Sequence, residues 1–208
     1  MGTRNALDRL PVAPSTAECL APAAIDALLP RDAVHQGLAA QVVPLVPAQL
    51  EDVVAAGTKR IVVLDQISDP HNLGAIFRSA AAFGFGAVVL QTRNAPPITG
   101  VVAKAAVGAI ETVQECRVVN ISRALDTLNT AGFHSVGLAG GGASEIAEAV
   151  AGAARLAIVL GAEGPGLRPG VAKACAQLAR IPIAAEMESL NVSNAAAIAF
   201  YEARQNAE

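Results

Sequence analysis

Ser189 and Asn191 lie where a strand-like apolar run gives way to a helical pattern. The run Leu178–Ile183 is followed by the stretch 184–191 and then by Val192–Arg204, in which apolar residues recur at helical spacing. The first backbone N–H groups of a helix have no partner inside it, and small polar side chains beside them bind those groups or a ligand. The two residues therefore either cap the helix or belong to a binding site, and the sequence leaves both interpretations open.

Glu163 lies among three glycines, Gly161, Gly164 and Gly166, directly after the apolar run Leu156–Leu160. Glycine permits positive φ and lets the backbone approach a ligand closely. The spacing is neither GxxxxGK[ST] nor GxGxxG, so neither of these phosphate-binding loops is indicated. A plain turn accounts for the glycines, whereas a carboxylate among them at the end of a strand favours a functional site.

Arg78 lies on a predicted helix, Leu73–Phe83, that follows the loop 69–72. The apolar residues of this helix recur at i, i+3, i+4 and i+7, and Arg78 lies off that stripe. Its neighbours one turn away are glycine and alanine, so no carboxylate of the same helix can pair with it. A planar guanidinium without such a partner suits a phosphate, although a solvated surface arginine is the commoner situation.

The elements that must position these residues alternate regularly from Arg60 onward. Apolar runs predict strands at Ile61–Leu64, Ala87–Leu90, His134–Leu138, Leu156–Leu160 and Leu178–Ile183. Helical patterns separate them at Leu73–Phe83, Ser122–Thr130, Glu145–Val150, Gly170–Ala176 and Val192–Arg204. This alternation predicts an α/β fold with a parallel sheet and helices on both faces. It also places the three stretches that contain Arg78, Glu163 and Ser189–Asn191 after strands, at the edge where open α/β sheets bind ligands.

The first 46 residues lack this alternation. Short helices are predicted at Asn5–Leu10 and Pro22–Leu29, and Leu38–Val46 predicts a strand, which Pro44 places at a sheet edge. Two helices and one strand make a thin core, so we expect a small and partial accessory domain.

The expected domain organisation follows from this contrast. Residues 1–46 form the partial N-terminal domain, 47–58 form a linker with a short helix near Ala48–Ala55, and 59–208 form the main domain.

The composition indicates a soluble globular protein of the cytoplasm. No window approaches the about 18 uninterrupted apolar residues of a membrane helix, and the start MGTRNALDRL has no apolar signal core. Three widely spaced cysteines without a CxxC pair disfavour a disulfide framework and a thiolate metal site, and no metal is expected. A net charge of −3 disfavours binding to nucleic acid by bulk electrostatics, so any RNA contact must be local.

Together the three stretches resemble the three motifs of the SpoU (TrmH-like) methyltransferases in the SPOUT superfamily. DPHNLGAIFRSAAAFG is similar to the first motif, VLGAEGPGL to the second and IPIAAEMESLNVSNAAAIAFYEA to the third, so the resemblance covers residues 60–204. VHQGLAAQV, Val34–Val42, further resembles the segment that joins two domains in bacterial guanosine 2′-O-methyltransferases of 23S ribosomal RNA. In that comparison residues 1–46 resemble only the second half of an N-terminal RNA substrate-binding domain.

The resemblance implies a fold and an activity. The fold would carry a deep C-terminal trefoil knot, and the activity would be transfer of a methyl group from S-adenosylmethionine to a ribose 2′-hydroxyl of RNA. A guanosine of 23S rRNA is favoured as the target, with tRNA as the alternative substrate. Relatives are homodimers whose active sites draw on both subunits, and we expect the final helix, with its alanine stripe and Phe200, to supply part of the subunit contact.

The resemblance also assigns residues to roles. The catalytic positions are Asn72, Arg78, Glu163, Ser189 and Asn191. The cofactor-binding positions are Gly140, Gly161, Ile181 and Leu190. A guanidinium with a pKa above about 12 is a poor base, so we favour Arg78 as a clamp for the neighbouring phosphate and the alkoxide. Glu163 would orient Arg78 or the nucleotide, and the motif does not require His71.

Two other classes of function are disfavoured by the sequence. A noncatalytic RNA-binding assembly factor with the same fold is disfavoured because all five catalytic positions are filled. A Rossmann-type nucleotide enzyme is disfavoured because its phosphate fingerprint is missing.

Overall fold

The computed structural model describes residues 1–8, 16–31 and 33–206, and these fall into two compact units, Met1–Leu45 and Val46–Glu208. The second unit contains all the strands of the described sheet. No helix in the described ranges is long and apolar enough to cross a membrane.

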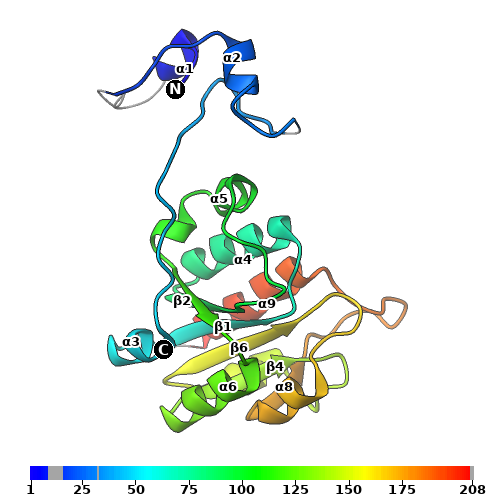
Figure 1. Cartoon of the computed structure of the whole chain (residues 1–208). Coiled ribbons are helices and arrows are strands. Elements are labelled where there is room, and N and C mark those ends of the chain that lie inside the picture. The colour runs from blue at the N-terminus through cyan, green and yellow to red at the C-terminus, as the bar shows by residue number, and fades with distance from the viewer. Residues whose placement is uncertain (9–15, 32, 207–208) are drawn as a thin grey trace. The chain divides into compact units, whose positions relative to one another are not determined.

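A seven-stranded sheet forms the centre of the second unit, and every strand pairing in it is parallel (Figure 1). The strands are β1 (Arg60–Asp65), β2 (Ala87–Gln91), β3 (Gln114–Val118), β4 (His134–Leu138), β5 (Ser144–Glu145), β6 (Leu156–Gly161) and β7 (Gln177–Arg180). Their order across the sheet is β3-β2-β1-β6-β4-β7-β5. The predicted parallel sheet is confirmed, and β3 and β5 are strands that the sequence analysis missed.

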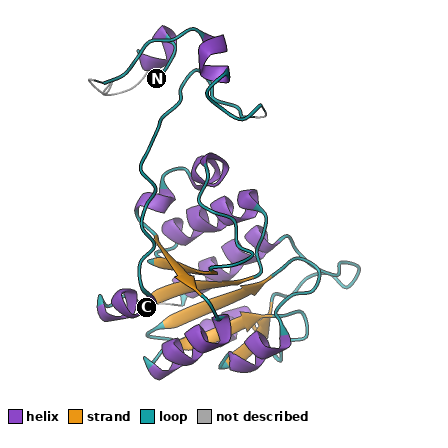
Figure 2. Cartoon of the chain, in the orientation of Figure 1, coloured by secondary structure: helices purple, strands orange, loops and turns teal. Residues whose placement is uncertain are grey.

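Helices cover both faces of this sheet, as predicted (Figure 2). One face carries α4 (Pro70–Ala82), α5 (Gly100–Ala106), the 3₁₀ turn η1 (Ala109–Glu111), α7 (Ile146–Val150) and α9 (Val192–Gln205). The other face carries α3 (Leu50–Ala55), α6 (Ile121–Thr130) and α8 (Pro169–Ala174). Because strand residues point alternately to the two faces, Val62 packs in the first layer and Ile61 in the second. That two-sided burial explains why the strands read as continuous apolar runs.

Helix α4 buries the predicted stripe completely, with Leu73, Ile76, Phe77 and Ala80 all at 0% exposure. Asp69 caps the helix by accepting a 2.9 Å hydrogen bond from the backbone N–H of His71.

The expectation that Phe200 of α9 contributes to a subunit contact is wrong, because Phe200 is fully buried against Phe85, with ring centroids 4.4 Å apart. Phe200 therefore stabilises its own chain and is not available for a subunit contact.

The segment 47–58, expected as a linker, lies within the second unit. It contains α3, whose Leu50 and Val53 are buried in the layer beneath α6. Arg155 holds the end of this segment by donating to the backbone carbonyls of Val54, at 3.1 Å, and of Thr58.

The first unit contains α1 (Arg4–Leu7) and α2 (Pro22–Asp26), shorter than the predicted helices, and part of the first prediction lies outside the described residues. The strand predicted over Leu38–Val46 is wrong. Only Leu38 forms a bridge, to Gly2, and the rest of the segment is extended chain with Val43 and Val46 about nine-tenths exposed. A strand needs a hydrogen-bonded neighbour, which β-branched residues alone do not provide.

Candidate active site

A pocket of about 230 Å³ opens at the carboxyl edge of the sheet, where the segments after β4, β6 and β7 meet. Its lining includes Leu138, Gly140, Leu160, Gly161, Glu163, Ile181, Ser189, Leu190 and Val192. All four predicted cofactor-binding residues, together with Glu163 and Ser189, thus border one cavity. Strand ends and loops of three separate elements form it, as expected for a ligand site in an α/β sheet.

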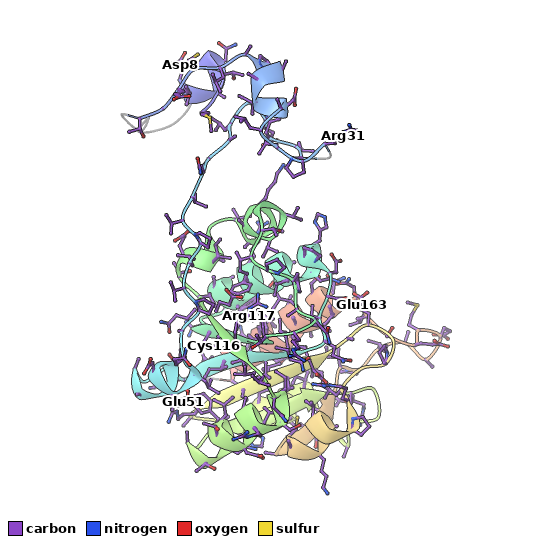
Figure 3. The ribbon with its side chains drawn as sticks, viewed as in Figure 1. Asp8, Arg31, Glu51, Cys116, Arg117 and Glu163 are labelled. Atoms are coloured by element: carbon purple, nitrogen blue, oxygen red, sulfur yellow. The ribbon has the colours of Figure 1, made fainter. Side chains whose placement is uncertain are left out.

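Glu163, labelled in Figure 3, is the centre of a hydrogen-bonded cluster at this pocket. Its Oε1 accepts hydrogen bonds from Asn72 Nδ2 at 3.0 Å, from Asn191 Nδ2 at 2.7 Å and from the backbone N–H of Val192 at 3.2 Å. Asn191 Nδ2 also donates to Asn72 Oδ1 at 3.0 Å. Oε1 therefore joins the start of α4, the loop after β6 and the start of α9.

Asn191 caps α9 and also belongs to the hydrogen-bonded cluster. Its Oδ1 caps α9 by accepting from the backbone N–H groups of Ser193, at 2.9 Å, and Asn194, and also from the Ser193 hydroxyl. Its Nδ2 is used in the cluster with Glu163 and Asn72. Capping thus fixes the orientation of the amide that the site uses.

Gly161 is required by the close approach of two backbone segments. A Cβ at this position would overlap the backbone of Gly166 and Leu167. The intervening turn is closed by a 2.9 Å hydrogen bond from Gly166 N–H to Ala162 O, and Gly164 and Gly166 both have positive φ. The turn places Glu163 beside the pocket.

An ion pair that the sequence analysis missed anchors the far end of this turn. Asp65, at 0% exposure, accepts from Arg168 Nε at 2.8 Å and from the Arg168 backbone N–H at 2.9 Å. The only sequence signal was a carboxylate at the end of a buried strand, which requires a partner. The Asp65 carboxylate also acts on Cys175: burial, and then Asp65, raises the pKa of that thiol to about 12.

Arg78 is not part of this cluster. Its side chain is exposed on α4, does not line the pocket and has no hydrogen bond or ion pair within residues 1–8, 16–31 and 33–206. The structure thus brings Asn72, Glu163, Ser189 and Asn191 together and leaves Arg78 apart within one chain. No group of three metal-ligating side chains occurs among the described residues.

A sequence model of the SpoU rRNA Methylase family matches residues 59–201, which include the whole pocket and the Glu163 cluster. The chain belongs to this family. The resemblance drawn from the three SpoU motifs is therefore confirmed, and the match leaves out the unit Met1–Leu45.

Individual SpoU relatives are similar over most of this chain. An uncharacterized tRNA/rRNA methyltransferase of Synechocystis sp. is 42% identical over 176 residues, which are 82% of this chain and 46% of that protein. The 23S rRNA (guanosine-2′-O-)-methyltransferase RlmB of Vibrio vulnificus is 41% identical over 173 residues, 81% of this chain and 70% of that one. The chain thus spans about half the length of the first of these relatives.

Solved SpoU-like structures share the fold. The AdoMet-bound rRNA methyltransferase from Sinorhizobium meliloti superposes with a TM-score of 0.71 at 28% identity, covering 77% of this chain and 61% of that one. The SpoU methyltransferase AviRb from Streptomyces viridochromogenes, in complex with AdoMet, gives a TM-score of 0.68 at 25% identity, covering 76% of this chain and 65% of that one.

Proposed function

We propose that this chain transfers a methyl group from S-adenosylmethionine to a ribose 2′-hydroxyl of RNA, with a guanosine of 23S rRNA as the target. The observation that carries the proposal is the Glu163 cluster, which holds Asn72 and Asn191 at the edge of a glycine-lined pocket. Membership of the SpoU family and the activity for which the RlmB relatives are named support the reaction and favour rRNA over tRNA.

The pocket suits S-adenosylmethionine, which supplies an electrophilic methyl group when bound. Apolar walls from Leu138, Leu160 and Ile181 suit a nucleobase, and glycine backbone at Gly140 and Gly161 offers polar groups without side chains in the way. The AdoMet complexes of two SpoU-like relatives support the same choice. Leu190 completes the lining from the loop before α9.

Glu163 positions groups and is not the base in this proposal. Three hydrogen bonds commit its Oε1 to holding Asn72, Asn191 and the start of α9. Oε2 accepts no hydrogen bond from the described residues. We assign Oε2, Asn72 and Ser189 to holding the ribose, and Asn191 to fixing the loop before α9.

Arg78 would bind the phosphate beside that ribose and stabilise the developing alkoxide. Because Arg78 lies outside the pocket lining of its own chain, we place it across the interface of a homodimer, so that each copy completes the site of the other. Exposed apolar residues on α9, Ile198 and Tyr201, support such an interface in place of Phe200. No metal is needed for this chemistry.

A C-terminal trefoil knot is part of the proposal. Strand β7 lies between β4 and β5, which follow each other in the chain and are joined by residues 139–143. The later strand therefore occupies a position between two earlier, directly connected strands, as a chain passed through a loop would.

We further assign residues 1–46 to an RNA substrate-binding domain and 59–208 to the SPOUT methyltransferase domain, onto which the segment 47–58, predicted as a linker, packs through α3. Binding of ribosomal RNA would place the protein in the cytoplasm. The local basic groups of the second unit then provide the RNA contacts that a net charge of −3 does not.

Two measurements test the proposed function. Calorimetry should show binding of S-adenosylmethionine, and maps of 2′-O-methylation in RNA from cells with and without the gene should differ at a guanosine of 23S rRNA. A difference in tRNA alone would transfer the activity to tRNA. Absence of cofactor binding would favour a noncatalytic RNA-binding assembly factor with this fold.

A further inference from the structure

A second cavity, of about 250 Å³, lies at the same edge of the sheet beside α6 and α8. It is lined by Gln91, Val119, Asn120, Ser122, Arg168, Gly170 and Val171. The turn from Ala162 to Arg168 borders both cavities, because Glu163 lines the first and Arg168 the second. A ligand that passes along this edge can therefore reach both.

Gln91, at the end of β2, has an amide without a partner. Its Oε1 is buried and accepts no hydrogen bond, and its Nε2 donates none to any residue in the described ranges. Buried polar atoms are nearly always hydrogen-bonded, so this oxygen is an acceptor that a water molecule or a ligand group in the cavity would satisfy. An amide presents one donor and one acceptor in one plane, which is the complement of a nucleobase edge.

The backbone that carries Gln91 is held firmly by Arg117 of β3, which Figure 3 labels. Arg117 Nη1 donates to the carbonyl of Gln91 at 3.3 Å, and Nη2 donates to the carbonyl of Pro96 at 2.8 Å. Glu115 pairs with the same guanidinium. The backbone of Gln91 is therefore fixed at the strand end, so only its side chain has to be ordered on binding.

Arg168 provides a cationic group at the same cavity. Its Nε and Nη2 are paired with Asp65, whereas Nη1 has no partner among the described residues, and its side chain is 40% exposed. A guanidinium fixed along one edge retains the other for a phosphate. Val119 is 87% exposed and adds apolar surface at the rim.

We propose that this cavity binds a nucleotide of the RNA substrate that flanks the methylated one, with Gln91 reading its base edge and Arg168 Nη1 contacting its phosphate. The inference rests on the proposed function and adds a specificity site to it. The Ala162–Arg168 turn, which contributes lining residues to both cavities, favours a neighbouring nucleotide of one strand over a separate small molecule.

Gln91→Leu tests the site, because leucine is of similar size and cannot read a base edge. The wild-type chain and the variant are compared on a 23S rRNA transcript that the wild type methylates. We expect KM for the RNA to rise about tenfold, the effect of one lost base contact, with kcat and S-adenosylmethionine affinity unchanged. Gln114→Leu is the matched control, because Gln114 is an exposed glutamine at the other end of neighbouring β3.

A purely structural role for Gln91 predicts a different pattern, in which Gln91→Leu changes the thermal midpoint and leaves KM unchanged. A second measurement replaces flanking nucleotides of the transcript, one at a time, by abasic ones. At one position the abasic RNA should raise the wild-type KM about as much as Gln91→Leu does, and the two changes should not add.

The outcomes distinguish failure of the nucleotide site from failure of the proposed methyltransferase function. If the wild type methylates RNA and Gln91→Leu leaves KM unchanged, or if the abasic and protein changes add at every position, the cavity holds only water and the nucleotide site is overturned. If the wild type neither binds S-adenosylmethionine nor methylates RNA, the proposed function fails, and the nucleotide site fails with it.

Discussion

Asn72 and Asn191, 119 residues apart in the chain, are joined by a 3.0 Å hydrogen bond, and both donate to the same oxygen of Glu163. The first residues of α4 and α9 are therefore fixed to each other through side chains as well as through the sheet. Removal of the Glu163 carboxylate should therefore weaken the hydrogen bonding at the starts of both α4 and α9.

Glu163→Ala should therefore affect both stability and reaction. Loss of the shared acceptor leaves the buried Asn72 Nδ2 and the Val192 N–H without a partner, whereas Asn191 Nδ2 keeps its bond to Asn72 Oδ1. The free energy of unfolding should therefore fall by about 1–3 kcal/mol. Small displacements of the groups assigned above to holding the ribose should slow single-turnover methylation on the order of a hundredfold. Denaturant titration and rapid-quench kinetics measure the two effects.

The matched control for this change is Glu188→Ala. Glu188 is exposed, lines the same pocket and has no hydrogen-bond partner among the described residues. Its loss should leave the free energy of unfolding within about 0.5 kcal/mol of the wild type. Equal stabilities of the two variants would contradict the role given to the Glu163 cluster.

Gly161→Ala and Gly140→Ala should separate the two glycines of the pocket. A Cβ at Gly161 would overlap the backbone of Gly166, whereas one at Gly140 would meet nothing within 4 Å. We expect Gly161→Ala to lower the free energy of unfolding by about 1–3 kcal/mol, and Gly140→Ala to leave it nearly unchanged. Thermal unfolding of the two variants checks this, and similar midpoints would show that the turn after β6 can shift to make room.

The fold was predictable from the sequence where burial alone determines the pattern. The stripe of α4 and the apolar runs of β1, β2 and β6 followed directly from periodicity. Strand β3 was missed because Gln114, Glu115 and Arg117 make it polar, and the structure shows its two charged residues, Glu115 and Arg117, paired with each other. Local composition could not reveal that pairing.

The site was predictable only in part, for a related reason. The family motifs named residues that the structure gathers around one pocket, with Arg78 as the exception. The pair of Asp65 and Arg168 was not predicted because the two residues lie 103 positions apart and meet only when β1 and β6 pair. Long-range contacts of this kind depend on topology and not on local pattern.

Cys175 should make stability sensitive to alkaline pH. Burial, and then the Asp65 carboxylate, raises its pKa from 9.0 to about 12. As pH rises from 9 towards 12, the unfolded chain loses this thiol proton while the folded chain keeps it, so the folded state becomes less stable. The loss should approach about 1.4 kcal/mol per pH unit from this thiol.

Urea titrations between pH 8 and about pH 10.5, within the window set by that raised pKa, measure this dependence. Cys175→Ala should flatten the alkaline fall in the free energy of unfolding relative to the wild type. Cys19→Ala, at an exposed cysteine, controls for removal of a thiol as such. An unchanged alkaline slope in Cys175→Ala would show that other groups cause the fall.

Arg78→Lys keeps the positive charge of the side chain and removes its planar fork. If Arg78 binds phosphate and alkoxide through directed hydrogen bonds, turnover should fall about a hundredfold, equivalent to about 2.7 kcal/mol in the transition state. Since Arg78 is exposed and has no partner among the described residues, folding and S-adenosylmethionine binding should remain unchanged. Methylation of the cognate RNA, calorimetry and thermal unfolding measure the three quantities.

Arg204→Lys is the matched control, because Arg204 is an exposed arginine in the last turn of α9, about 20 Å along that helix from Asn191. A change at a solvated arginine should alter turnover by no more than about 0.5 kcal/mol in activation free energy.

The proposed placement of Arg78 across a homodimer interface can be tested with mixed dimers. Chains carrying Arg78→Lys, mixed with chains carrying Glu163→Ala, should regain activity, because a mixed dimer contains one site in which both residues are intact. Failure of the mixture to recover activity, with mixed dimers demonstrated by sedimentation, would place Arg78 and Glu163 in the same chain's site or remove Arg78 from the reaction.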